Sequence, residues 1–223
     1  MSVEYIDHMG DDLSVVNAAR VSLAKESVWN YTDDEFSDTF LDSRDEKLIE
    51  YLAKNNHITP FFHCIIKYRV KAPIFIARQF FRSNIGIARN EVSRRYVDTD
   101  PEFYLPEYFR PKAENIKQGS TDVEHAHNDY WNDYLKRQCE LSLQTYQSMI
   151  QDGVAPEQAR MILPQNMMTE WIETASLAAC ARIYNLRIDG HAQKEIQILA
   201  KKLGEMVQPL FPVCWKFLTN GTV

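Results

Sequence analysis

A run of arginines between residues 73 and 96 is the part of the sequence best suited to chemistry. The charged residues of this stretch are Arg78, Arg82, Arg89, Arg94, Arg95 and Glu91. Guanidinium groups match phosphate and carboxylate oxygens bidentately, and Asn90 and Ser93 add neutral donors. The stretch is therefore predicted to bind a small phosphorylated ligand. The competing interpretation is a solvated basic surface that pairs with acids elsewhere in the chain.

Two other stretches place polar side chains beside apolar runs. His57 and His63 are candidate metal ligands, but Cys64 adjoins His63 directly instead of standing at a zinc-like gap, so we expect no metal site. Arg160 precedes the apolar run 161–163 and needs a partner if it is buried. From the residues alone, an internal salt bridge and a ligand contact are both open for Arg160.

A further pair of residues lies on one predicted helix. Ser176 and Arg187 are about three helical turns apart and so share a face. The helix dipole also favours an arginine in the last turn, which is a purely structural reason for Arg187 to stand there.

These segments together resemble the flavin-dependent thymidylate synthases. The family signature is an Arg-His-Arg triplet followed by Asn-Glu-x-Ser-x-Arg-Tyr. Here the second part is intact at 90–96, whereas the triplet is replaced by Arg-Ser-Asn at 82–84. The similar blocks His-x-Thr-Pro-Phe, Ala-Arg-x-x-Leu-Pro and Leu-Arg-x-Asp-x-His-Ala-Gln stand at 57–61, 159–164 and 186–193. The chain is identified as a variant member, because the blocks appear in family order from residue 20 to residue 193.

The resemblance implies a set of site residues. The nucleotide ligands would be Gln79, Arg82, Glu91, Ser93, Arg94, Arg95, Arg160 and Arg187. The cofactor ligands would be Ser22, His57, Thr59, Arg82, Ser83, Asn84, Asn90, Glu91, Ser176, Arg182 and Leu186. Arg187 would be the catalytic residue, stabilising charge on a uracil ring, and none of the four cysteines stands where the family does chemistry.

The resemblance also implies a reaction. It is the reductive methylation of dUMP to dTMP, with methylenetetrahydrofolate as carbon donor, FAD as hydride carrier and NADPH as reductant. The sequence has no G-x-G-x-x-G turn for a Rossmann dinucleotide site, and the family instead holds FAD between the subunits of a homotetramer. A catalytically degenerate protein that binds nucleotide and flavin is the alternative, and an RNA-binding module is a weaker third.

Composition limits the class of protein. The chain has 223 residues, 45% hydrophobic content and a net charge of −6, which disfavours general nucleic-acid binding. It lacks a run of about eighteen apolar residues and a signal-peptide core, so we expect neither a membrane span nor export. Scattered cysteines without C-x-x-C spacing indicate reduced thiols of a cytoplasmic protein, in the host cytoplasm if the source is viral.

Periodicity predicts the elements that must position these residues. We expect strands at 3–8, 63–70 and 96–105, and helices at 11–21, 42–54, 73–81, 122–150, 156–163, 169–187 and 191–207. Residues 83–95 are expected to form a polar loop, and residues 29–41 a loop or broken helix. Without a linker or repeat, residues 1–223 are expected to form a single α+β domain of several helices around a small, mostly antiparallel sheet.

Overall fold

The computed structural model describes residues 1–32, 39–97, 99–114 and 119–219. Within them the strands are β1 (Ser2–Met9), β2 (Asn30–Tyr31), β3 (Thr39–Phe40), β4 (Ile65–Pro73), β5 (Ile87–Glu91) and β6 (Met168–Ser176). The α-helices are α1 (Asp12–Arg20), α2 (Ser43–Lys54), α3 (Ile74–Phe80), α4 (Asn128–Gln151), α5 (Pro156–Ala159), α6 (Leu177–Ile188), α7 (Lys194–Val207) and α8 (Pro212–Leu218). The 3₁₀ helices are η1 (Val21–Leu23), η2 (Thr59–Phe62) and η3 (Arg160–Ile162).

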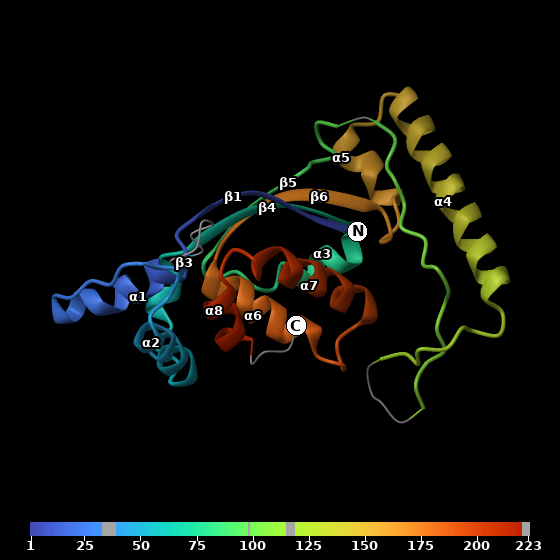
Figure 1. Ribbon diagram of the computed structural model, residues 1–223. Helices are drawn as coiled ribbons and strands as arrows, with labels where there is room; N and C mark the ends of the chain where they lie inside the picture. The colour runs from blue at the N-terminus through green and yellow to red at the C-terminus, as the bar shows by residue number, and fades with distance from the viewer. Residues whose placement is uncertain (33–38, 98, 115–118, 220–223) are drawn as a thin grey trace.

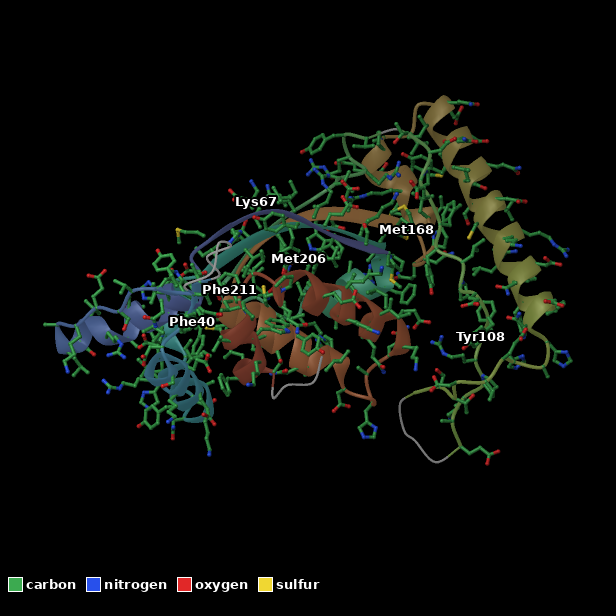
Figure 2. All side chains as sticks on the ribbon, viewed as in Figure 1. Phe40, Lys67, Tyr108, Met168, Met206 and Phe211 are labelled. Atoms are coloured by element: carbon green, nitrogen blue, oxygen red, sulfur yellow. The ribbon has the colours of Figure 1, made fainter. Side chains whose placement is uncertain are left out.

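An antiparallel sheet in the order β1-β4-β6-β5 forms the centre of the described residues. Helices α3, α6, α7 and α8 cover one of its faces, with α1 and α2 at one end and α4 and α5 at the other (Figure 1). Strand β4 alternates strictly, because Tyr68 and Val70 are buried whereas Lys67 lies on the face turned away from the helices (Figure 2). The α+β prediction is confirmed.

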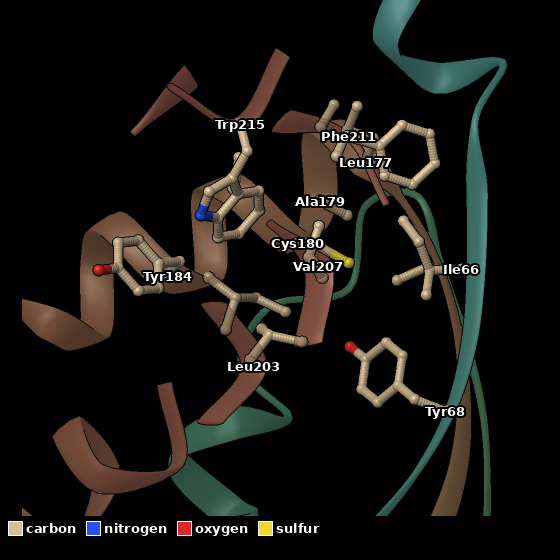
Figure 3. Close-up of a cluster of buried hydrophobic side chains, with 14 of the residues drawn as sticks. Ile66, Tyr68, Leu177, Ala179, Cys180, Tyr184, Leu203, Val207, Phe211 and Trp215 are labelled. Carbon is tan, nitrogen blue, oxygen red and sulfur yellow. The ribbon is translucent and has the colours of Figure 1, made fainter. Parts of the chain in front are cut away.

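The core lies between β4 and the C-terminal helices. Figure 3 shows Tyr68 reaching in from β4 toward a cluster that includes Tyr184 and Trp215, whose rings meet edge to face at 5.3 Å. Helices α6 and α7 approach closely because Gly204 faces the Tyr184 ring, where a Cβ would lie 2.6 Å from a ring carbon. Asp12 joins α1 to α8, since its carboxylate accepts from the backbone N–H of Cys214 at 2.9 Å.

The predicted starts of α1 and α2 are confirmed because local side chains cap both helices. The Asp11 carboxylate accepts from the N–H of Ser14 at 2.7 Å. The Ser14 hydroxyl oxygen in turn accepts from the N–H of Asp11, which completes a capping box. Asp42 caps α2 by accepting from the N–H of Arg44 at 2.8 Å. Among the described helices, none has the length and apolar character needed to cross a membrane.

Two predicted elements that flank the site are wrong. The polar loop expected at 83–95 contains β5, an edge strand that pairs with β6 from Ile87↔Ala175 to Glu91↔Trp171. The single helix expected at 169–187 is strand β6 followed by helix α6. β6 contains the helix-favouring residues Met, Glu and Ala, but pairing with strands on both sides overrides that propensity.

Three smaller expectations also change, and one helix is new. Residues 96–105 form only an isolated bridge at Phe103↔Met167 among those described, not a strand. Residues 30–31 and 39–40 pair as β2 and β3, while 33–38 of the expected loop lie outside the described residues. Pro73 ends β4 and is the N-cap residue of α3, so the helix expected at 73–81 begins at Ile74, and it buries Ile76, Ala77 and Phe80. Helix α8 is an element for which sequence reasoning gave no expectation.

Candidate functional site

A polar cavity of about 980 Å³, here called the arginine cleft, lies where the C-terminal ends of α3 and α6 meet the α6–α7 turn. The residues lining it are Gln79, Arg82, Arg110, Gly119, Ser120, Asp122, Asn185, Leu186, Arg187, Asp189, Gly190, His191, Ala192, Gln193, Lys194 and Gln197. Sequence reasoning placed Gln79, Arg82, Leu186 and Arg187 in a binding site, and the fold brings these four together.

The electrostatics of the cleft are dominated by two arginines without an acidic partner. Arg187 donates from Nη2 to the backbone oxygen of Gln79 at 2.6 Å, while its Nε is buried with no hydrogen-bond partner. Burial and then the charge of Arg82 lower the pKa of Arg187. No ion pair found among the described residues includes either arginine. The cleft therefore suits an anion or an electron-rich carbonyl oxygen.

Helix α6 positions Arg187 from a rigid base. Its N-cap Ser176 accepts from the N–H of Ala179 at 3.2 Å, and its first two turns are buried. The small residues Ala178, Ala179 and Ala181 let neighbouring elements approach closely. Arg187 stands in the last turn, so the buried N-terminal part of the helix supports its guanidinium at the mouth of the cleft.

A second cavity of about 1130 Å³, here called the apolar cavity, lies on the other side of the α6 C-terminal end. Its apolar lining residues are Ala53, Ile58, Phe62, Ala178, Ala181, Leu186, Phe217 and Leu218, and its polar lining residues are Glu50, Lys54, Asn56, Arg182, Asn185 and Lys216. Asn185 and Leu186 line both cavities, so the two spaces share a wall. Apolar walls with three cations suit a flat ring system that carries phosphates.

The turn that follows helix α3 lies against several of the predicted cofactor ligands. Ser83 is buried, and Ser176 donates its N–H to the oxygen of Gly86 at 2.9 Å. Gly86 has φ +76°, and a Cβ there would lie 2.7 Å from the Ser176 hydroxyl oxygen, so only glycine suits the position. Arg182 donates to the oxygen of Ile85 at 2.8 Å. The predicted residues Ser83, Ser176 and Arg182 therefore meet at this turn.

A buried ion pair supports the same turn, and sequence reasoning missed it. Glu173 is fully buried and accepts from the Tyr68 hydroxyl at 2.6 Å, the Trp171 indole at 3.1 Å and Arg89 Nε. Arg89 packs over the Phe81 ring and donates from Nη1 to Asn84 Oδ1 at 3.1 Å. The sequence of β6 gave no signal for this pair, because residues 169–175 do not alternate between apolar and polar types, although their burial alternates in the folded strand.

Burial also changes the pKa of the Tyr68 hydroxyl. Desolvation, followed by the nearby Cys180 and Glu173, raises the pKa of the Tyr68 hydroxyl well above its ordinary value. Tyr68 therefore keeps its proton and serves as a hydrogen-bond donor to Glu173.

Five predicted nucleotide ligands lie outside both cavities: Glu91, Ser93, Arg94, Arg95 and Arg160. Arg95 pairs with Glu157 at 3.4 Å, and Arg160 donates from Nε to the backbone oxygen of the same residue at 3.2 Å. The internal salt bridge considered for Arg160 is not what the structure shows, because Arg160 is exposed. These arginines stand just after β5 and in η3, which follows α5 at the end of the sheet remote from α1 (Figure 1).

The remaining predicted ligands are spread over several elements. Ser22 lies exposed in η1 and donates to the oxygen of Ala19 at 2.9 Å. His57 and Thr59 do not line the apolar cavity themselves, but their chain neighbours Asn56 and Ile58 do. Asn90 and Glu91 lie exposed on β5, and Glu91 Oε1 accepts from the Thr169 hydroxyl at 2.6 Å. Among the described residues, no cluster of three or more metal-ligating acids, histidines and cysteines occurs.

The cysteines are poor nucleophiles because all four are buried. Burial, then Asp11 and Asp12, raises the pKa of Cys64 to about 12. Burial likewise raises the pKa of Cys180 and of Cys214. The charge of Glu173 adds to the effect at Cys180, and the charge of Asp12 adds to it at Cys214. Cys139 faces Asn166, whose Nδ2 lies 3.2 Å from its sulfur. A thiolate nucleophile needs the opposite environment, with a lowered pKa.

A protein with all four cysteines replaced by alanine is therefore expected to retain most of its activity for each correctly folded molecule. Alanine is the better replacement, because a serine hydroxyl buried there would need a new partner. The measurement is turnover per bound cofactor, with circular dichroism as the control for folding. A folded but inactive cysteine-free protein would contradict the expectation.

Comparisons of the sequence and of the fold with known proteins agree with one another. Residues 4–213 match the family described as thymidylate synthase complementing protein. The chain is 36% identical over 213 residues to a flavin-dependent thymidylate synthase of Thermosipho africanus, covering 95% of this chain and 87% of that protein. It is 37% identical over 213 residues to the flavin-dependent thymidylate synthase of Thermus thermophilus, covering 96% of this chain and 73% of that protein. The solved UMP/dUMP methylase PolB from Streptomyces cacaoi, bound with 5-Br dUMP, matches with TM-score 0.81 and 28% identity over 98% of this chain and 94% of that one.

Proposed function

The chain belongs to the flavin-dependent thymidylate synthase family, and from this premise we propose that it converts dUMP to dTMP by reductive methylation. Methylenetetrahydrofolate supplies the carbon, NADPH is the reductant, and FAD is the flavin. The whole chain, residues 1–223, acts as a single domain in the cytoplasm. The observation that carries the proposal is the arginine cleft, where Arg187 and Arg82 face each other without an acidic partner.

The residues present fit a flavin. The apolar cavity offers Phe62 and Leu186 as walls for a ring system, and Arg182, Lys54 and Lys216 as cations for phosphates. The sheet is antiparallel, so it provides no βαβ phosphate site, and the cofactor must be held by helix side chains and the turn at 82–86. When bound there, the flavin supplies the hydride chemistry.

The side chains of the cleft bind and polarise the pyrimidine. Arg187 donates from its free guanidinium N–H groups to a ring carbonyl oxygen, and its charge stabilises the negative charge that develops on that oxygen. Within the described residues only its Nη2 is bonded, to the backbone oxygen of Gln79, and its Nε has no protein partner, so most of its donor capacity is available to a ligand. Gln79 holds the opposite side of Arg187 through its backbone oxygen, which fixes the direction of the guanidinium. Arg82 adds the second positive charge of the cleft.

The purified protein is expected to be yellow, with noncovalently bound FAD released into the supernatant by heat. Its visible spectrum identifies a flavin, and chromatography of the supernatant separates FAD from FMN. Incubation with dUMP, methylenetetrahydrofolate and NADPH should then form dTMP. A colourless protein that takes up no added FAD would overturn the proposal. A protein that binds FAD and dUMP yet forms no dTMP would instead favour the degenerate binding protein.

We also propose that the active form is a homotetramer. Support comes from the separation of the predicted ligands, because Arg95 and Arg160 lie away from the cleft that contains Arg187. Pockets shared between copies would bring the two sets together. Helix α4 adds an uncovered aromatic surface at Tyr130 and Trp131, whose rings pack together at 4.9 Å.

Light scattering of the purified protein should therefore give the mass of about four chains, a common closed assembly. Mixing two inactive variants, Arg160→Ala and Arg187→Ala, and allowing subunits to exchange should restore part of the activity, since some mixed pockets are intact. A monomer with full turnover would contradict this expectation.

A further inference from the structure

A chain of hydrogen bonds links a buried carboxylate to the proposed catalytic arginine. Glu195 is 5% exposed, and its Oε1 accepts from Arg110 Nη2 at 2.6 Å. Its Oε2 accepts from Gln193 Nε2 at 2.8 Å. Gln193 Oε1 in turn accepts from Gln79 Nε2, and the backbone oxygen of Gln79 accepts from Arg187. The side-chain bonds therefore run from Glu195 to the Gln79 amide in the arginine cleft, and Arg187 binds the backbone of that same residue.

The direction of the two glutamine bonds in this chain follows from Glu195. An ionised carboxylate only accepts hydrogen bonds, whereas a glutamine amide has a donating and an accepting end. Glu195 therefore makes Gln193 present its NH₂ group, so the Gln193 oxygen faces Gln79. Gln79 must then turn its own NH₂ group toward Gln193. Among the described residues none donates to Gln79 Oε1, which is left as a free acceptor on a residue that lines the arginine cleft together with Arg187.

We propose that Glu195, acting through Gln193, is a positioning residue that makes the cleft select uracil over cytosine. The inference rests on the proposed function in assigning a pyrimidine nucleotide to this cleft. Uracil presents a carbonyl acceptor next to the N3–H donor, which matches the donor of Arg187 beside the acceptor of Gln79. Cytosine presents a lone pair at N3, which would face the Gln79 oxygen and leave both groups unpaired.

The test is calorimetric binding of dUMP and dCMP to the flavin-loaded protein. The wild-type protein should prefer dUMP strongly. Glu195→Gln keeps the shape but adds a donor, so the Gln193 and Gln79 amides can both reverse. The preference for dUMP over dCMP is expected to fall roughly tenfold, the effect of about one hydrogen bond. Gln193→Leu, which keeps the Arg110–Glu195 ion pair, should lower the preference similarly and serves if Glu195→Gln fails to fold.

Asp122→Asn is the matched control. It makes the same carboxylate-to-amide change on the wall of the same cleft, but Asp122 pairs with Lys194 at 3.0 Å and is outside the chain. It should change both affinities alike and leave their ratio unaltered. A loss of preference in this variant equal to that of Glu195→Gln would overturn the inference, because the cleft charge alone would then explain the effect.

A reciprocal exchange gives the sharpest result. In Gln79→Glu, two carboxylates face the single Gln193 amide and only one can be satisfied, so dUMP binding should weaken. In Gln79→Glu combined with Glu195→Gln, the whole chain reverses and residue 79 again presents an acceptor. The double variant should therefore recover preference for dUMP relative to either single variant, a recovery that a merely structural role for Glu195 would not produce.

The outcomes separate this inference from the proposed function. If the wild-type protein forms dTMP and prefers dUMP, but Glu195→Gln and Gln193→Leu keep the full preference, the inference is wrong and the function stands. If the wild-type protein forms dTMP without preferring dUMP over dCMP, the inference is also wrong. If the wild-type protein binds neither nucleotide and forms no dTMP, the proposed function fails, and the inference fails with it.

Discussion

Arg187→Ala is expected to lower dTMP formation by about a hundredfold or more, the usual effect of removing a preorganised charge donor. The substitution removes the guanidinium whose Nε has no partner in the protein, so little in the folded chain is left unpaired except the backbone oxygen of Gln79. The flavin should remain bound, because Arg187 lines the arginine cleft and not the apolar cavity. The measurements are turnover and flavin content of the same preparation.

Arg182→Ala provides the comparison on the same helix. Arg182 lines the apolar cavity and donates to the oxygen of Ile85 at 2.8 Å, so its loss should weaken flavin binding first. Arg187→Lys keeps the charge without the planar fork and should recover only part of the turnover. Normal turnover in a flavin-loaded Arg187→Ala protein would exclude the role given to this residue.

Glu173→Ala is expected to destabilise the protein by about 3–5 kcal/mol, the range for removing one partner of a buried ion pair. Glu173 is 0% exposed, and the Arg89 side chain is only 13% exposed. Without the carboxylate, the Tyr68 hydroxyl and the Arg89 guanidinium would both lose their buried acceptor. Urea unfolding monitored by tryptophan fluorescence measures the change, with flavin removed so that cofactor binding does not contribute.

Glu170 on the same strand is the matched control for Glu173. It pairs with Arg69 on the opposite face of the sheet, and the two side chains are 39% and 43% exposed. Glu170→Ala should therefore cost less than about 1 kcal/mol, as exposed ion pairs do. Equal losses from the two substitutions would show that the Glu173 network does not support the fold. A flavin affinity that falls only in Glu173→Ala would connect the network to Asn84.

Several features could be predicted from the sequence because they depend on neighbours within one or two turns. Asp11 and Asp42 mark the starts of α1 and α2, since each carboxylate accepts from an N–H two or three residues later. The apolar spacing within residues 42–54 indicated a helix for the same reason, and in α2 Ile49 and Leu52 are buried on one face. The arginine-rich stretch and the family blocks were visible for the same reason, because each is a short pattern of residue types.

Strands β5 and β6 could not be predicted, because their stability comes from pairing across the chain. The polar segment of β5 is a strand only because Ala175 and Trp171 of β6 lie opposite Ile87 and Glu91. Local propensity gave the wrong answer for β6, where a buried Glu173 is tolerated only once Arg89, 84 residues earlier, folds against it. Such contacts leave no local pattern in the sequence.

The candidate site shows the same division. Residue types indicated that the arginine stretch with Arg82 could bind an anionic ligand, because guanidinium groups have that chemistry wherever they stand, and the family resemblance added Gln79 and Arg187. Only the tertiary structure decided that these three share one cleft while Arg160 lies elsewhere. It also brought Gln193 to Gln79 from 114 residues away, and so determined which end of the Gln79 amide is free. The direction of a hydrogen bond is a property of the assembled network, whereas a sequence specifies only the groups that can take part.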